Sequence, residues 1–134
     1  MSVFTETELE FLGRNQFPGG NGARRLARIA TVGKDGTPHV VPVGFSYNPE
    51  HDSIDIRGHT MVESKKYRDV QRSGRAAIVV DDLASTDPWR PRGIEVRGRA
   101  EAVDGDRPLI RVHPERIVPW GLVPDSGARS VNGA

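Results

Sequence analysis

Short runs of valine and isoleucine, several of them alternating with polar residues, occupy the middle of the chain. This alternation has the period of a half-buried β-strand, in which successive side chains point to opposite faces. The pattern predicts strands over residues 27–32, 39–47, 53–58, 75–82 and 93–103. The Asp35–Gly36 pair is a hairpin signal and residues 48–52 form a second turn, so the first three strands are expected to form a meander.

Two segments instead favour helices. Thr5 and Glu8 have the spacing of a capping box and precede an apolar stretch, which predicts a short N-terminal helix. Residues 61–73 place apolar and ionisable side chains near helical spacing, which predicts a second helix with one narrow buried face. Residues 17–22, rich in glycine, are expected to form a loop.

The remaining segments have weaker patterns. Residues 81–92 contain two prolines and no periodicity and are expected to form a loop, and residues 110–122 contain two prolines and a tryptophan. Residues 125–134 have little to bury and are expected to be a disordered tail after a single domain, 1–124. Five or six short strands with few helices indicate a mainly β fold, an antiparallel barrel, because closure removes exposed edges. An OB-like barrel stays open at this point.

Composition narrows the class of protein. The chain has 134 residues, 19 Lys and Arg against 18 Asp and Glu, and no cysteine. The near-zero net charge implies no general attraction to nucleic acid or membranes, and the absence of cysteine excludes disulfides and thiolate catalysis. With no apolar leader and no long apolar run, a cytoplasmic location is expected.

The strongest chemical feature is the basic stretch at residues 64–68. A hydroxyl and up to three cations beside a helix start can hold a phosphate, although the same stretch could be a solvated helix face. Elsewhere the four histidines have no diagnostic metal spacing, residues 19–25 lack the lysine of a phosphate-binding P-loop, and no nucleophile elbow occurs. No metal site and no catalytic side chain are therefore predicted, and reactivity would come from a bound cofactor.

Several blocks in order resemble a known family. They are residues 29–33 with the 35–36 turn, 38–45, 64–68, 81–85, 87–93, 97–100 and 113–122. Together they are similar to the pyridoxamine-phosphate-oxidase-like split barrels, and within them to the actinobacterial F420-dependent branch that includes the reductase of oxytetracycline biosynthesis. The resemblance covers about residues 4–122.

The resemblance implies a split β-barrel homodimer with a flavin-like cofactor in a groove at the subunit interface. By the family pattern, the cofactor-binding residues are Ser64, Lys65 and Lys66 at the phosphate, Arg57, Gly58 and His59 at the strand end beside it, Val41, Pro42 and Val43 along the ring, and Trp120 as a wall of the groove. For Val41–Val43 and Trp120, ordinary core packing is the alternative.

One departure from the family pattern bears on the cofactor. Pyridoxamine-phosphate oxidases carry an arginine and a lysine on the second strand, where this chain has Val41 and the Gly44–Phe45 pair. F420 is therefore favoured over FMN, and the expected activity is hydride transfer from reduced F420 to a small electrophilic organic substrate. The alternatives are an FMN-dependent oxidoreductase of the same fold, a non-enzymatic flavin-binding module and, more weakly, an OB-like single-strand binder, against which the few aromatic residues argue.

Overall fold

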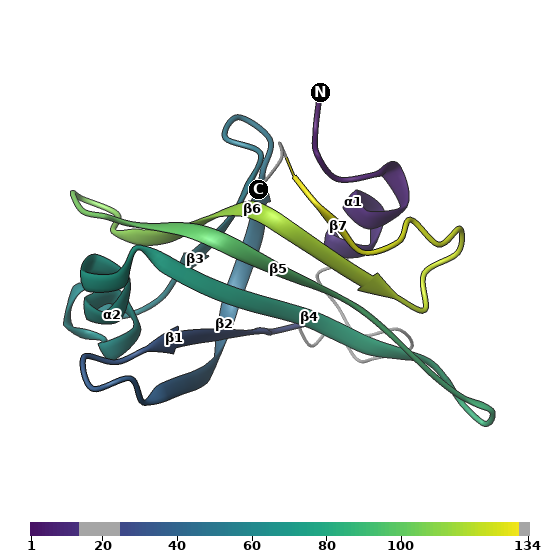
Figure 1. Cartoon of the computed structure of the whole chain (residues 1–134), viewed down its shortest axis with the longest axis horizontal. Helices are drawn as coiled ribbons and strands as arrows, with labels where there is room; N and C mark the ends of the chain where they lie inside the picture. The colour runs from purple at the N-terminus through teal and green to yellow at the C-terminus, as the bar shows by residue number, and fades with distance from the viewer. Residues whose placement is uncertain (14–24, 132–134) are drawn as a thin grey trace.

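The fold is built on one antiparallel sheet that closes on itself. The computed structural model describes residues 1–13 and 25–131, and its strands follow the order β3-β2-β1-β4-β5-β6-β7. An additional pairing between β3 and β6 closes the sheet into a barrel (Figure 1). The expectation of a mainly β split barrel is confirmed. The loop expected at residues 17–22 lies outside the described residues.

The bounds of the elements agree with most of the sequence-based expectations. The strands are β1 (Ala27–Val32), β2 (Pro38–Asn48), β3 (Ser53–Arg57), β4 (Arg75–Thr86), β5 (Trp89–Val103), β6 (Leu109–Trp120) and β7 (Arg129–Ser130), and the helices are α1 (Glu6–Leu12), the 3-10 turn η1 (Met61–Glu63) and α2 (Lys65–Ser73). The capping box of α1 is present, with Thr5 accepting from the Glu8 amide and Glu8 from the Thr5 amide.

The barrel interior is filled by the apolar side of each strand. Ile29, Ile54, Ile78 and Val96, from four different strands, are each at most 1% exposed. Helix α2 packs against β1 and β5 at one end of the barrel and contributes the buried ring of Tyr67 to the core. Strands such as β1 and β4 alternate because only one of their faces reaches this core, whereas in β3 the polar Ser53 and Asp55 are buried as well.

Residues 81–92 form a β-hairpin arm, so the expected loop is wrong. Strand β4 continues to Thr86 and β5 starts at Trp89, with cross-strand pairs up to the tip of the hairpin. The arm projects from the barrel as a two-stranded ribbon (Figure 1). Because much of such a ribbon has no buried face, its sequence carries little of the alternation by which strands are recognised.

Residues 125–131 are held against the barrel, which corrects the expectation of a disordered tail for this part of the chain. Strand β7 pairs with β6 through Arg116↔Ser130 and Ile117↔Arg129, and Val131 is 7% exposed. Arg129 donates to both carboxylate oxygens of Glu8 in α1, at 2.7 and 2.9 Å. A contact between residues this far apart in the chain leaves no trace in local composition.

Candidate functional site

The basic stretch begins helix α2. Ser64 is the N-cap, and its hydroxyl accepts from the Tyr67 amide at 3.3 Å and donates to the Met61 carbonyl at 2.6 Å. The first amides of a helix have no partner within it, so those of Lys65 and Lys66 point toward any anion bound at this end. Backbone donors and lysine charges therefore coincide here.

The two lysines of this turn differ in their surroundings. The ammonium of Lys65 lies 3.3 Å from the Asp69 carboxylate, one helical turn further on. Lys66 is half-buried and makes no hydrogen bond or ion pair with the part of the chain that the structure describes. Lys66 is thus the side chain whose charge is available to a ligand.

Arg57, Gly58 and His59, at the end of β3, lie at the edge of one cavity, whose lining does not include Ser64, Lys65 or Lys66. The cavity has a volume of about 440 Å³ and is lined by Arg25, Leu26, Gly44, Phe45, Ser46, Asp55, Arg57, Gly58 and His59. Pairing of Gly44 with Arg57 brings the second strand to the same place. Thr60, which follows, has φ of 49°, a left-handed conformation that is strained for a β-branched residue. Strain of this kind is concentrated at binding sites.

Asp55 forms the floor of this cavity as a fixed carboxylate. Arg111 donates to both of its oxygens, at 3.1 and 3.3 Å, and Asn48 and Ser53 donate as well. Burial raises the pKa of Asp55, but these hydrogen bonds outweigh it and hold the pKa below its usual value. Asp55 is therefore a charged structural anchor at neutral pH.

The three residues expected along the cofactor ring do not share a face of β2. Val43 is 7% exposed and belongs to the core, whereas Pro42 lies on the outer face of the sheet. Val41 faces the same way as Val43 but is 39% exposed, because it lies nearer the end of the barrel. Of the three side chains, that of Val43 is withdrawn from any external ligand.

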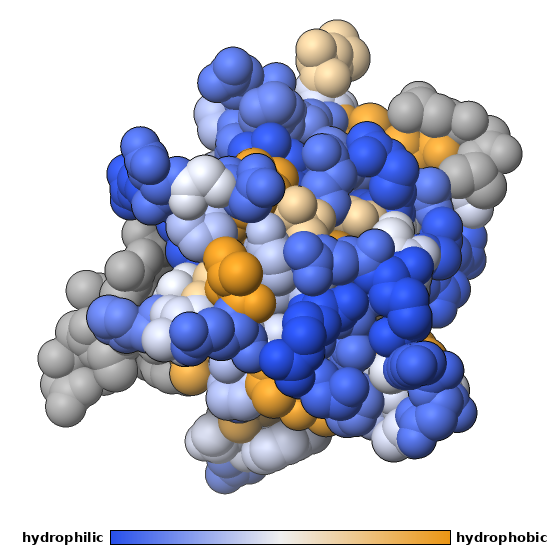
Figure 2. Space-filling model, turned by 90° about the vertical axis from the view of Figure 1, so that its left-hand side faces the viewer, coloured by the Kyte–Doolittle hydropathy of each residue, from blue (hydrophilic) through white to orange (hydrophobic). Residues whose placement is uncertain are grey.

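The outer face of the sheet is partly apolar and framed by charge. Cross-strand register places Pro42, Arg28, Val79, Glu95 and Val118 in one row across five strands. At the end of the barrel that carries α2, the exposed apolar side chains are Val32, Val40, Val41 and Val62. Figure 2, which faces the end carrying α2, shows hydrophobic patches between strongly hydrophilic surroundings.

Trp120 lies on the same outer face but far from Pro42. Its indole packs on Gly93, where an added Cβ would lie 2.5 Å from the tryptophan Cζ2 atom. On one side of the barrel β1, β4 and β5 lie between β2 and β6, and on the other side only β3 does. Strand β3 pairs with β6 at residues 110–112, which is about 26 Å along the strand from Trp120. Within one chain, the structure does not bring Trp120 to the other expected cofactor residues.

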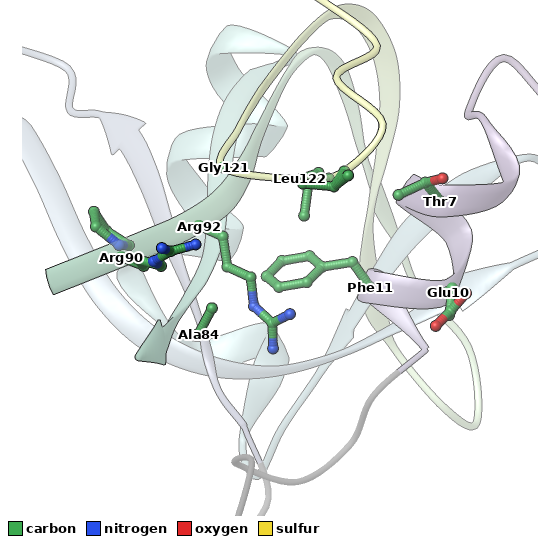
Figure 3. A pocket seen from close by; sticks show the side chains of 10 residues that line it. Thr7, Glu10, Phe11, Ala84, Arg90, Arg92, Gly121 and Leu122 are labelled. Carbon is green, nitrogen blue, oxygen red and sulfur yellow. The ribbon is translucent and has the colours of Figure 1, made fainter. Parts of the chain in front are cut away.

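A further cavity of about 520 Å³ lies between α1 and the β-hairpin arm (Figure 3). The ring of Phe11 faces the guanidinium of Arg92 at 5.3 Å, and Arg92 donates to both oxygens of Asp82. Leu122 closes the cavity from the side of the chain that follows β6. These contacts join α1 to the arm.

Two further observations concern metals and membranes. Within residues 1–13 and 25–131, no group of three or more histidine or carboxylate side chains is arranged to hold a metal ion. Among the same residues, no helix has the length and apolar character needed to cross a membrane.

Comparison with known proteins identifies the family. The family model described as pyridoxamine 5'-phosphate oxidase matches residues 22–129, and the chain belongs to this family. The chain is 38% identical over 131 residues to a 5a,11a-dehydrotetracycline/5a,11a-dehydrooxytetracycline reductase of Streptomyces rimosus, covering 91% of this chain and 86% of that protein.

Two other similar proteins have F420 in their names. An F420H(2)-dependent biliverdin reductase of Mycobacterium tuberculosis is 35% identical over 88 residues, which cover 66% of this chain and 57% of that protein. A solved structure named as an F420 reductase superposes with a TM-score of 0.61 at 21% identity, over 85% of this chain and 98% of that one. At this identity the solved structure supports the fold alone.

Proposed function

We propose that this protein is an F420-dependent reductase that acts as a homodimer and transfers a hydride from reduced F420 to a small electrophilic organic substrate. The oxidoreductase class rests on membership of the family and on two similar proteins that are named reductases. The observation that carries the cofactor assignment is the start of α2, where Ser64 caps the helix. There Lys66, which has no partner among the described residues, and two helix amides would form a site for a phosphate.

The residues present fit a cofactor that has a ring and a phosphate. They offer no cation on the second strand, so the phosphate would be held by α2 alone. Lys66 and the amides of Lys65 and Lys66 would hold the phosphate, and Arg57, Gly58 and His59 would border it from the end of β3. The ring would lie on Pro42 and the backbone of Val41 and Val43, which offer an apolar surface. An uncharged second strand suits a cofactor other than FMN, and this favours F420.

Two copies of the chain would complete the groove. The outer face of the sheet carries exposed apolar side chains such as Val40, which is 65% exposed. Because Trp120 lies at the far end of β6 from the residues that pair with β3, it is distant from Pro42 in one chain and would reach the cofactor only from the partner subunit. A homodimer packed through this face would therefore bring together the residues that one chain keeps apart.

The protein would contribute binding and orientation to the reaction. Reduced F420 supplies a hydride when bound, and no side chain of the site is required as a nucleophile. The apolar face around Pro42 would hold the substrate against the ring and exclude water from it, which raises the rate by fixing the distance between the reacting atoms.

Hydride transfer is tested with reduced F420 that carries deuterium at the carbon that donates the hydride. Biliverdin and a 5a,11a-dehydrotetracycline are the first substrates to try, because similar proteins act on them by name. We expect substrate-dependent reoxidation of F420 and a product heavier by one deuterium. Reoxidation with no deuterium in the product would contradict direct hydride transfer.

A further inference from the structure

All three lysines of the chain lie at one end of the molecule. They are Lys34, Lys65 and Lys66, and every other cation among the 19 Lys and Arg residues is an arginine. Lys34 is in the turn between β1 and β2, and the other two begin α2. Lys34 and Lys65 line one cavity of about 550 Å³ together with Asp35, Thr37 and His39.

A buried carboxylate fixes two walls of this cavity. The side chain of Asp69 is 1% exposed and accepts hydrogen bonds from Thr31 at 2.8 Å, from Nδ1 of His39 at 3.1 Å and from Lys65 at 3.3 Å. The guanidinium of Arg72 lies 3.6 Å away. Burial raises the pKa of Asp69, but the three hydrogen bonds outweigh it, and the net pKa lies below the usual value. The network therefore ties β1, β2 and α2 together around a permanent negative charge.

The backbone is shaped to accept the His39 ring. An added Cβ at Gly33 would lie 2.7 Å from Cε1 of His39, so only glycine leaves room for the ring at this position. Because Nδ1 donates to Asp69, the other ring nitrogen, Nε2, is the one left for a ligand. The ring is 30% exposed and stands beside the Lys65 side of the cavity.

The charges around the cavity leave an excess of cations. Lys34 is exposed and makes no ion pair with the described residues, while Asp35 is occupied in the turn, where it accepts from the Thr37 amide at 3.0 Å. Asp69 forms ion pairs with both Lys65 and Arg72. Lys34 and Lys65 line the cavity, Arg72 pairs with Asp69 behind it, and Lys66 follows Lys65 in α2, so four cations stand against the two carboxylates of Asp35 and Asp69 at this end of the barrel.

We infer that the cavity between the β1–β2 turn and α2 is a second anion subsite beside the proposed phosphate site. A ligand held through its phosphate by Lys66 and the first amides of α2 would place a second anionic group, such as a carboxylate or phosphate, between Lys34 and Lys65. Asp69 acts as a positioning residue, because it holds Lys65 and His39 at the wall of the subsite. The inference rests on the proposed phosphate site but not on the identity of the ring.

Inorganic anions test the subsite without a cofactor. Phosphate and tripolyphosphate are titrated into the wild-type protein and into Lys34→Ala, Lys66→Ala and, as a matched control on the distant arm, Arg90→Ala. We expect Lys34→Ala to weaken tripolyphosphate binding about tenfold, equivalent to about 1.4 kcal/mol, and to leave phosphate binding unchanged, since only the longer anion reaches Lys34. Lys66→Ala should weaken the binding of both phosphate and tripolyphosphate, and Arg90→Ala should weaken the binding of neither.

Amine labelling gives an independent measurement, because the chain has only three lysines. Acetylation followed by mass spectrometry should show protection of Lys34, Lys65 and Lys66 by tripolyphosphate, and of Lys66 but not Lys34 by phosphate. An unchanged tripolyphosphate affinity of Lys34→Ala, or an unprotected Lys34, would overturn the second subsite. Loss of F420 binding with both anion results intact would overturn the proposed cofactor and leave the subsite standing.

Discussion

Replacing Arg129 by alanine should remove the contact that holds the end of the chain to α1. The Glu8 side chain is fully buried, and Arg129 donates to both of its oxygens and to the Val3 carbonyl. Removing one partner of a buried pair leaves an uncompensated charge and typically costs about 3–5 kcal/mol. Because Arg129 is 27% exposed and Ser126 still donates to Glu8, we expect about 3 kcal/mol.

Urea unfolding followed by circular dichroism measures this loss. With a slope of about 1–3 kcal/mol per molar urea, the midpoint should fall by about 1 M or more. A Glu8→Gln/Arg129→Ala double variant is the control, because glutamine keeps the capping box but carries no charge to leave unpaired. The double variant should be more stable than Arg129→Ala alone. A midpoint within about 0.2 M of wild type for Arg129→Ala would refute the reasoning.

The pH dependence of the same variant follows from the pKa of Glu8. Burial raises this pKa, but hydrogen bonds from Arg129, Ser126 and the Thr5 amide outweigh it, so the pKa is lower folded than unfolded. The stabilisation by the pair is therefore complete above the unfolded pKa of about 4.3 and is lost as the pH falls through the folded pKa. The difference in unfolding free energy between wild type and Arg129→Ala should therefore become smaller as the pH falls below the folded pKa of Glu8.

Three further variants and one control variant test the site and the proposed dimer. Lys66→Ala should weaken F420 binding at least tenfold, measured by fluorescence titration, and change the unfolding free energy by less than about 0.5 kcal/mol. The control Arg68→Ala should leave both the F420 affinity and the unfolding free energy nearly unchanged. Gly93→Val should displace the Trp120 indole and cost about 1–3 kcal/mol, visible in tryptophan fluorescence and urea unfolding. Val40→Glu should shift the protein from dimer to monomer in analytical ultracentrifugation; a wild-type monomer would contradict the proposed interface.

Sequence alone predicted the elements whose patterns come from burial. Strand β3 alternates because its isoleucines face the core, and α1 begins at a capping box that local spacing reveals. The arm and β7 were missed because their partners are distant or their faces are exposed. In β6, Pro114 sits where the register shifts against Gly98, so a proline that argues against a strand is accommodated by an irregularity of the pairing.

The candidate site was predictable only in part. Its basic turn is visible as a run of residues, and Arg57, Gly58 and His59 are consecutive residues that line one cavity of the structure, while their role at a cofactor stays a prediction. Asp69 was missed as a part of the site because its partners come from three elements, although its i,i+4 spacing from Lys65 was a local signal. The separation of Trp120 from β2 depends on strand order, which periodicity does not determine.

The measurement that tests the central claim most directly is a paired titration of the purified protein with F420 and with FMN, followed by fluorescence. The proposed function predicts saturable F420 binding and FMN binding at least tenfold weaker, with Lys66→Ala reducing the F420 affinity. FMN binding as tight as or tighter than F420 binding would contradict it.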